Sequence, residues 1–349
     1  MGTFSGILIA LAIWGVLMYC MRFVGHVKVR ENFEAYLYLA PAGAVLLVFW
    51  FIPVVLSVYV SLTDWTGAAT FGTAKFQAFV NYKRALLDPD FKQVLYNTFN
   101  YVIYSVPLTI LAALLIASAM NSKIRGRNVF RTIYFLPYIT TWVATSIVFK
   151  YFFNESFGLG NYLLEKFFGP DWRLGWLAES RGIFEVFLGD FMKIKMPQNL
   201  NPLLAGPSLA MFAVILSSVW RDVGYFMVIF LAGLQNIDRS YYEAAEIDGA
   251  SPWQRFRHVT WPLLSPTTFF ILIISMIAAF KVFVPMYIMT PTGGPGRSTE
   301  TLVFYLFKVG FDGYRELGYA SAVAYILFII ILLLTVAQNR FFGRKVHYD

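Results

Sequence analysis

Long runs of apolar residues constrain the fold of this chain more than any other feature of its sequence. Seven runs are at least 20 residues long, and a helix of about 20 residues spans the apolar core of a bilayer. They occupy residues 2–21, 36–62, 98–120, 132–153, 208–235, 262–290 and 318–338. Charged residues make up 14% of the chain, against about 25% in soluble domains. We therefore predict an all-α polytopic membrane protein with seven spans.

The first run could instead be a cleaved signal peptide. Residues 2–21 carry no charge, and no basic region precedes them. The basic stretch 22–30 follows without a small-residue cleavage site, which a signal peptide requires. We predict that residues 1–34 form a retained anchor helix and a basic cytosolic linker.

The connection over residues 154–207 is too long and too polar for a simple turn. Its middle, residues 182–192, is amphipathic with the period of a helix. We predict that about 154–207 form an insertion outside the membrane.

The distribution of Lys and Arg predicts the orientation. With the N-terminus outside, the cytosolic segments 22–34, 121–131, 236–260 and 339–349 hold 13 basic residues in 60 positions. The outer loops 63–97, 154–207 and 291–317 hold 12 in 116 positions. Basic residues concentrate on the cytosolic side of membrane proteins. The same placement explains the net charge of +8 without a nucleic-acid partner.

The polar stretch 240–262 between two apolar runs is dense in helix signals. Ser240 and Glu243 have the spacing of a capping box, which predicts a helix beginning at Tyr241. Gly249 suits the left-handed position that ends such a helix. Ala244 and Ala245 leave a low surface that another protein could approach closely.

Two further start signals follow in the same stretch. Ser251 and Pro252 have the order of an N-cap and a first-turn proline. Thr260 and Pro262 repeat a start signal before the next apolar run. The stretch therefore predicts two short helices and a return to the membrane, although an ordinary loop is equally compatible with the spacing.

The same residues resemble the EAA loop of ABC importer permeases. The match consists of Glu243 to Ala245, Gly249, Val259 and Trp261-Pro262, where Trp261 departs from the leucine of the family pattern. Residues elsewhere resemble the carbohydrate-uptake branch, namely Asn97-Thr98, 131–137, Trp220, Gly224, 231–235, 280–283 and 293–295. The resemblance implies a type I importer transmembrane domain over residues 35–349. Its six-helix core would carry one extra N-terminal helix.

By this resemblance, the loop at 240–262 would dock on a separate ATPase subunit. Glu243 would make polar contacts, Ala244 and Ala245 would permit close approach, Gly249 would give the turn, and Pro262 would begin the return to the membrane. The implied partners are a second homologous permease, an ATPase dimer, an extracytoplasmic solute-binding protein and membrane lipid. ATP and magnesium would bind to the ATPase, in a bacterial or archaeal cell membrane.

The chain has no sequence signature of its own catalysis. The P-loop pattern GxxxxGK[ST] is absent, so this chain does not bind ATP through such a loop. Cys20 is the sole cysteine, and His26, His258 and His347 lie too far apart in sequence to form a metal motif. We predict a transporter subunit without bound cofactors.

Sugar contacts in maltose-importer relatives map here onto two helical sets. The first is Trp220, Gly224 and Met227, and the second is Ser275, Ala278, Ala279 and Val282. Most of these residues are apolar or small, so packing between helices is an equally good explanation. Charges inside membrane spans usually face a cavity or a partner, so Arg221, Asp222 and Lys281 are expected either to pair at a helix or subunit interface or to contact the substrate.

The expected function is translocation of a sugar or oligosaccharide. The alternatives are a glycerol-phosphate or polyol importer, or a secondary transporter that works alone. An ATPase docking loop would distinguish an importer subunit from a self-sufficient carrier.

Overall fold

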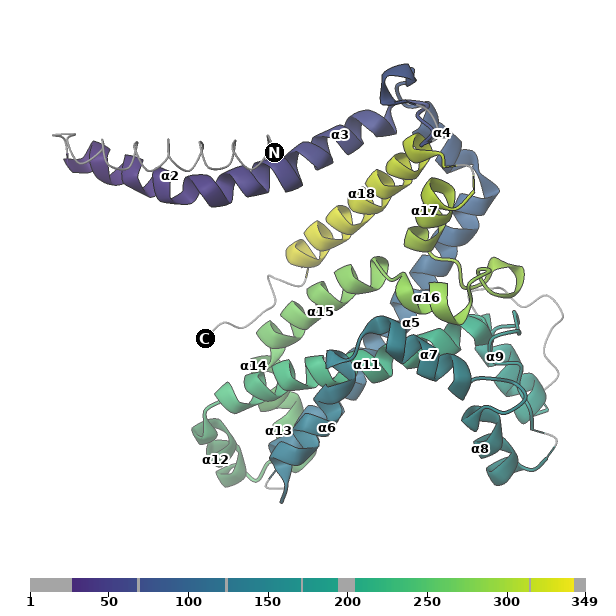
Figure 1. Ribbon diagram of the computed structural model, residues 1–349. Helices are drawn as coiled ribbons and strands as arrows, with labels where there is room; N and C mark the ends of the chain where they lie inside the picture. Colours follow the sequence, from purple (N-terminus) through teal and green to yellow (C-terminus); the bar gives the residue numbers. More distant parts are fainter. Residues whose placement is uncertain are drawn as a thin grey trace.

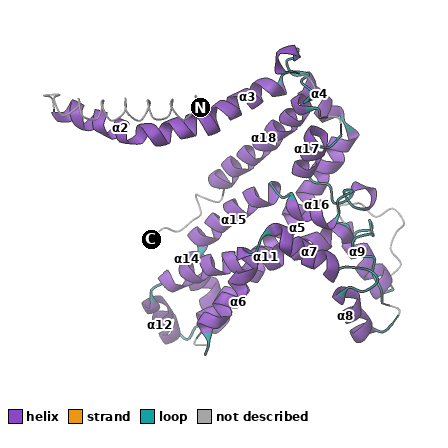
Figure 2. Cartoon of the chain, viewed as in Figure 1, coloured by secondary structure: helices purple, strands orange, loops and turns teal. Residues whose placement is uncertain are grey.

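A computed structural model describes residues 27–67, 70–122, 125–170, 172–193, 205–313 and 315–341. Throughout these ranges the regular structure is helical, and no strand occurs in them (Figure 2). The predicted first span, 2–21, lies outside the described residues, so the seven-span count is not confirmed. Within the described ranges, four helices are long and apolar enough to cross a membrane, or up to six spans if each of two bent helix pairs counts as one.

Two long spans form the centre of the molecule. They are α5 (Pro89–Asn121) and α11 (Leu209–Asn236), which pack along one another (Figure 1). The α5 helix begins nine residues before the predicted span, because Asp88 caps it and Pro89 occupies its first turn.

The predicted span 132–153 is broken into two helices. These are α6 (Arg127–Ile139) and α7 (Trp142–Phe152), which meet at an angle of 97°. Thr140 and Thr141 are extended, and the Thr141 hydroxyl caps α7 by accepting from the Ala144 N–H. A threonine that competes for backbone hydrogen bonds favours such a helix start over an uninterrupted helix.

The predicted span 262–290 is also interrupted. A helical stretch of α13 (Pro252–Arg255), the π-helical η5 (Phe256–Thr260) and α14 (Trp261–Leu263) leads into α15 (Ser265–Phe280) at 64°. After Phe280 the chain turns before α16 (Val284–Met289). The bend at Leu264 is flanked by Pro262 and Pro266, which cannot donate backbone hydrogen bonds.

A long N-terminal arm extends away from the rest of the chain (Figure 1). The arm comprises α2 (Val27–Leu46), the π-helical η2 (Leu47–Phe51) and α3 (Ile52–Ser61). Residues 27–34, predicted as a linker, belong to the α2 helix. Only 6% of the apolar window in Glu34–Ser61 is buried, and a hydrogen bond of 2.8 Å between the Ser57 and Tyr325 hydroxyls fastens α3 to α18 (Leu317–Phe341).

The connection after α7 contains α8 (Leu159–Phe168), α9 (Ile183–Val186) and the π-helical η4 (Phe187–Phe191). The prediction of helix over residues 182–192 is therefore confirmed. Asn161 organises the first part, since its amide donates to the Glu155 and Leu174 carbonyls and its oxygen accepts from Trp176.

A polar cluster joins the start of α5 to α4 (Val80–Leu87), α17 (Leu302–Phe311) and α18. The hydroxyls of Tyr305 and Tyr319 donate to Asp88 at 2.9 and 3.0 Å. Burial by itself raises the pKa of Asp88, but the hydrogen bonds from Tyr305, the Asp90 backbone and Tyr319 outweigh it and lower the pKa overall. Asp88 is thus both a helix cap and a tertiary contact.

Candidate functional site

The short helix α12 (Arg239–Ile247) follows α11 after a two-residue turn. Its N-cap is Asp238, whose carboxylate accepts from the Ser240 N–H at 2.8 Å. The predicted cap at Ser240 is therefore wrong, and the helix begins at Arg239 rather than Tyr241. Asp238 is also a preferred cap residue and stands two positions before Ser240. The helix that it caps therefore begins earlier and includes Ser240 in its first turn.

The predicted capping box with Glu243 does not form. The Glu243 carboxylate instead lies 4.0 Å from the Arg239 guanidinium, and the Glu243 side chain is 67% exposed. Ala244 is exposed beside it, and Ala245 is half-buried. These side chains leave one side of α12 open to a partner.

Gly249 ends α12 with a φ of +74°, which confirms the predicted left-handed conformation. The N–H groups of Gly249 and Ala250 donate to the carbonyls of Glu246 and Ala245. No heavy atom lies within 4 Å of the position a Cβ would take at Gly249. The demand for glycine therefore comes from the backbone conformation and not from crowding.

The second helix start is confirmed and the third is not. Ser251 and Gln254 form a complete capping box at α13. Thr260 has helical backbone angles and no capping bond, so the helical stretch runs through it to Pro262, which is half-buried in α14. Thr260 instead bonds the Tyr242 hydroxyl at 3.0 Å and ties the stretch to α12.

Four large hydrophobic side chains are exposed on the same segment, namely Tyr241, Ile247, Trp253 and Trp261. The most exposed are Ile247 at 87% and Trp253 at 68%. No role was predicted for Ile247 or Trp253, although apolar residues inside a polar stretch were the available signal. Exposed apolar side chains next to small residues and a carboxylate are typical of a docking surface.

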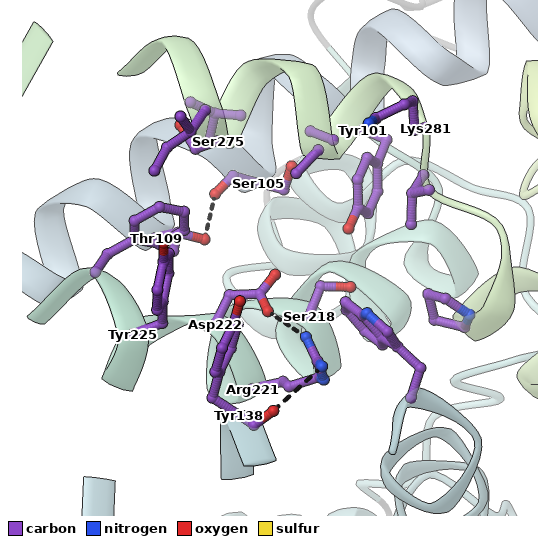
Figure 3. Close-up of a pocket in the computed structure, with 18 of the residues that line it drawn as sticks. Tyr101, Ser105, Thr109, Tyr138, Ser218, Arg221, Asp222, Tyr225, Ser275 and Lys281 are labelled. Carbon is purple, nitrogen blue, oxygen red and sulfur yellow. Dashed lines mark hydrogen bonds and ion pairs between the residues drawn. The ribbon is translucent and has the colours of Figure 1, made fainter. Parts of the chain in front are cut away.

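A cavity of about 510 Å³, here called the central cavity, lies between α5, the α6–α7 break, α11 and α15. Its polar lining is mostly hydroxyl groups and aromatic rings, with three charged residues. Figure 3 labels Tyr101, Ser105, Thr109, Tyr138, Ser218, Arg221, Asp222, Tyr225, Ser275 and Lys281 among the residues around it.

Arg221 and Asp222 form an ion pair in the wall of this cavity. Arg221 Nη1 donates to Asp222 Oδ1 at 2.8 Å. Side chains at adjacent positions of a helix point in different directions, so this pairing does not follow from the sequence alone. The guanidinium carbon lies 4.1 Å from the Trp142 ring centroid and 5.0 Å from that of Tyr138. Tyr138 also stacks on Tyr225, with centroids 4.5 Å apart.

The second predicted set of pathway residues lines the central cavity. Ser275, Ala278, Ala279 and Val282 all contribute to its wall. They come from α15 and the turn after it, opposite the polar groups of α5 and α11.

The first predicted set does not line the central cavity. Trp220 is 47% exposed and packs against Phe149, with ring centroids 5.3 Å apart. A Cβ added to Gly224 would lie 1.8 Å from the Tyr134 carbonyl oxygen, so this position is a close helix contact. Met227 is fully buried in the core. Here α11 turns this face toward α6 and the core.

The contribution of α5 to the cavity was not predicted from the sequence. Tyr101, Ser105 and Thr109 line the cavity at a spacing of four residues along one helix. Hydroxyl groups repeating at that spacing inside an apolar run were the signal. Within the described ranges no group of three His, Cys, Asp or Glu residues is placed to hold a metal.

Comparison with known proteins identifies relatives over almost the whole chain. Residues 91–348 match the family described as binding-protein-dependent transport system inner membrane component. The lactose transport system permease protein LacF of Rhizobium radiobacter is 35% identical over 307 residues, covering 87% of this chain and 92% of LacF. The sn-glycerol-3-phosphate transport system permease protein UgpA of Agrobacterium fabrum is 30% identical over 314 residues, covering 90% and 96%.

A solved structure has the same fold. It is the crystal structure of a bacterial ABC transporter involved in the import of the acidic polysaccharide alginate, with a TM-score of 0.67 and 20% identity. The match covers 91% of this chain and 97% of that one. The predicted all-α, type I importer fold and the resemblance to carbohydrate-type permeases are thus confirmed, and the chain is a multi-pass membrane protein that belongs to the family of binding-protein-dependent transport system inner membrane components.

Proposed function

We propose that this chain is the permease of an ATP-driven importer that carries a sugar or oligosaccharide from an extracytoplasmic binding protein through the central cavity. The observation that carries the proposal is the cavity wall, in which hydroxyl groups, stacked tyrosines and an ion pair occur among apolar spans. Sugars need hydrogen-bond partners and an apolar or aromatic face, and this wall offers both.

The α12–α14 segment (residues 239–263) is the proposed docking site for the ATPase, which would bind ATP and magnesium. Its exposed Glu243 and Ala244 and its fixed turn at Gly249 support this assignment. The α11 helix runs without interruption from the cavity wall to this segment. A motion of the docked ATPase would therefore reach the cavity through one rigid helix.

A second permease is the proposed neighbour of the arm. Side chains such as Phe49, Trp50 and Phe51 are each at least 67% exposed, and they are apolar around the whole helix. A helix that is apolar on all sides is covered in the native state by lipid or by another membrane helix. Membrane lipid would cover the apolar faces of the arm that the second permease does not contact.

Reconstitution tests this function. The chain, its partner permease and the ATPase are placed in liposomes. Uptake of radiolabelled lactose is measured with loaded binding protein outside the liposomes and an ATP-regenerating system inside them. ATP-dependent accumulation is expected only with all components. Concentrative uptake by the purified chain alone would support the self-sufficient carrier instead.

A glycerol-phosphate importer is the second candidate. Lys281 favours it, because this cation lines the central cavity and would attract a phosphate. Glycerol 3-phosphate therefore serves as the competing substrate in the same assay.

The proposed orientation places the N-terminus outside and the α12–α14 segment in the cytosol. Single cysteines at the exposed positions Ser156 and Asn128, in a chain whose Cys20 is replaced by serine, test it. An impermeant maleimide should label position 156 on intact cells and position 128 only after permeabilisation. The reverse pattern would contradict the orientation.

A further inference from the structure

Asp222 presents an unused hydrogen-bond acceptor to the central cavity. Its Oδ1 accepts from Arg221, and the part of the chain that the structure describes supplies no other hydrogen bond to this carboxylate. The Asp222 side chain is 24% exposed although it lies in the middle of a membrane span. Figure 3 shows the carboxylate on the α11 side of the cavity, with Ser105 and Thr109 of α5 above it.

Arg221 also lines the central cavity, but most of its side chain is buried and held by contacts on several sides. Its side chain is 12% exposed, it lies over the Trp142 ring, and its Nη2 donates to the Tyr138 carbonyl at 3.3 Å. Tyr138 belongs to the last turn of α6, where carbonyls lack donors from their own helix and attract cations. Arg221 therefore fixes the position of Asp222 and joins α11 to the α6–α7 break.

We infer that Asp222 is a substrate-binding residue that accepts hydrogen bonds from the hydroxyl groups of an uncharged saccharide unit, and that Arg221 is its positioning residue. This inference rests on the proposed function and adds the substrate class. A hydrogen bond to a carboxylate is stronger than one between neutral groups, and it needs a donor, which a sugar hydroxyl supplies. A phosphate or uronate at this place would instead meet like charge.

The stacked ring of Tyr225 adds the second element of a saccharide site. Tyr225 and Tyr138 lie within 11° of parallel, and both line the cavity next to Asp222. An aromatic ring packs against the C–H face of a sugar while a neighbouring carboxylate binds its hydroxyl edge. Lys281 lies away from Asp222 in Figure 3, on the side of Tyr101.

A purely structural ion pair is the competing explanation, and paired substitutions separate the two. Asp222→Asn leaves Arg221 buried without a counter-charge, so it lowers activity under both explanations. The double variant Arg221→Gln with Asp222→Asn replaces the pair by neutral groups of similar size. If the pair only supports packing, the double variant lowers uptake of lactose and of every analogue by the same factor, because the contacts of Arg221 with the α6–α7 break are lost. If Asp222 binds substrate, the double variant also loses the discrimination between lactose and its deoxy analogues.

The test uses the complete transporter in liposomes with radiolabelled lactose, its monodeoxy analogues and glycerol 3-phosphate as probes. Wild-type transporter is expected to take up at least one deoxy analogue about tenfold more slowly than lactose, the effect of losing one hydrogen bond to a charged group. In Asp222→Asn and in the double variant this ratio should fall toward one. Arg221→Lys, which keeps the charge, should retain more of the discrimination than Arg221→Gln. Asp312→Asn, an exposed carboxylate outside the cavity, is the control.

The ratio is informative because a packing defect lowers uptake of every analogue alike. An unchanged ratio in Asp222→Asn, or wild-type uptake by the double variant, overturns the inference and leaves the proposed function standing. Preferential wild-type uptake of glycerol 3-phosphate over lactose also overturns it. Absence of ATP-driven uptake of all the probes contradicts the proposed function itself.

Discussion

The α12–α14 segment and the central cavity are built in opposite ways. In the segment, the contacts that set its shape join residues close in sequence, such as Asp238 with Ser240 and Ser251 with Gln254. In the cavity, Arg221 contacts the Tyr138 carbonyl across 83 positions of the chain, and α5 supplies further wall residues. The segment has several exposed side chains, whereas the cavity encloses those of its wall.

Because of this difference, the two regions are sensitive to different kinds of substitution. The docking segment depends on a few backbone conformations and on what its surface carries. The cavity depends on how closely helices approach, because every wall residue moves with its helix. Substitutions at two glycines test both dependences. Gly249 is required because its φ is positive, and Gly224 is required because a side chain there would collide with α6.

The largest effect is expected at the close helix contact. Gly224→Ala would place a Cβ 1.8 Å from the Tyr134 carbonyl oxygen, so α11 must move away from α6. Overpacking of this kind costs about 1–3 kcal/mol or more, and here it also separates Arg221 from Tyr138. We expect a lower Tm of the purified transporter and loss of uptake. Gly189→Ala, where a Cβ has no neighbour within 4 Å, is the control. Equal Tm values for the two variants would show that α6 and α11 can move apart without loss of stability.

The next effect is expected at the turn of the docking segment. Gly249→Val forces a β-branched residue to φ +74°, at a cost of about 1–3 kcal/mol. Because Gly249 lies in an exposed turn outside the apolar helices, the strain should be relieved by a local change of the turn. Insertion should therefore not change, while co-purification of the ATPase and substrate-stimulated ATP hydrolysis should fall. Gly189→Val, at a position without positive φ, should leave both unchanged. Normal coupling in Gly249→Val would remove the turn from the docking mechanism.

A smaller effect is expected from the surface charge of α12. Glu243→Lys reverses a charge on a side chain that is 67% exposed, so it should weaken ATPase association by about fivefold without altering the fold. Binding of the detergent-solubilised ATPase to immobilised permease measures this. Asp248→Lys makes the same charge change at the end of the helix. Equal losses in the two variants would indicate a general effect of charge rather than a docking contact at Glu243.

The smallest effect is expected at Asp88, which combines both kinds of contact. Its lowered folded-state pKa means that the ionised carboxylate stabilises the fold above its unfolded pKa of about 4, and that this contribution is lost as the pH falls through the folded value. Asp88→Asn should therefore lower Tm at pH 7 and have little effect well below pH 4. Tm measurements across this range, with Asp312→Asn as control, check this; a constant difference between wild type and variant would exclude the ionised form as the cause.

The sequence predicted most of the apolar helices and two of the local signals in the α12–α14 segment, because both depend on local chemistry. Hydropathy located the helices, and Gly249 and Ser251 were correctly placed because caps and turns involve neighbours within a few positions. The sequence pattern favoured Ser240 as the N-cap, whereas the structure uses Asp238. Both residue types cap helices, so only the folded backbone selects between them. The sequence pattern missed the α6–α7 break because paired threonines are compatible with a continuous span as well.

What the sequence alone determined is therefore an all-α membrane protein whose polar stretch 240–262, between the fifth and sixth apolar runs, resembles the EAA loop. Apolar length and cap spacing are properties of consecutive residues. The tertiary structure decided which faces of α5, α11 and α15 surround the cavity. Helical spacing shows that residues share a face, but the rotation of a helix follows from its packing partners. For that reason Ser275 reaches the cavity, Gly224 meets α6, and Asp222 lines a wall to which helices far away in the chain also contribute.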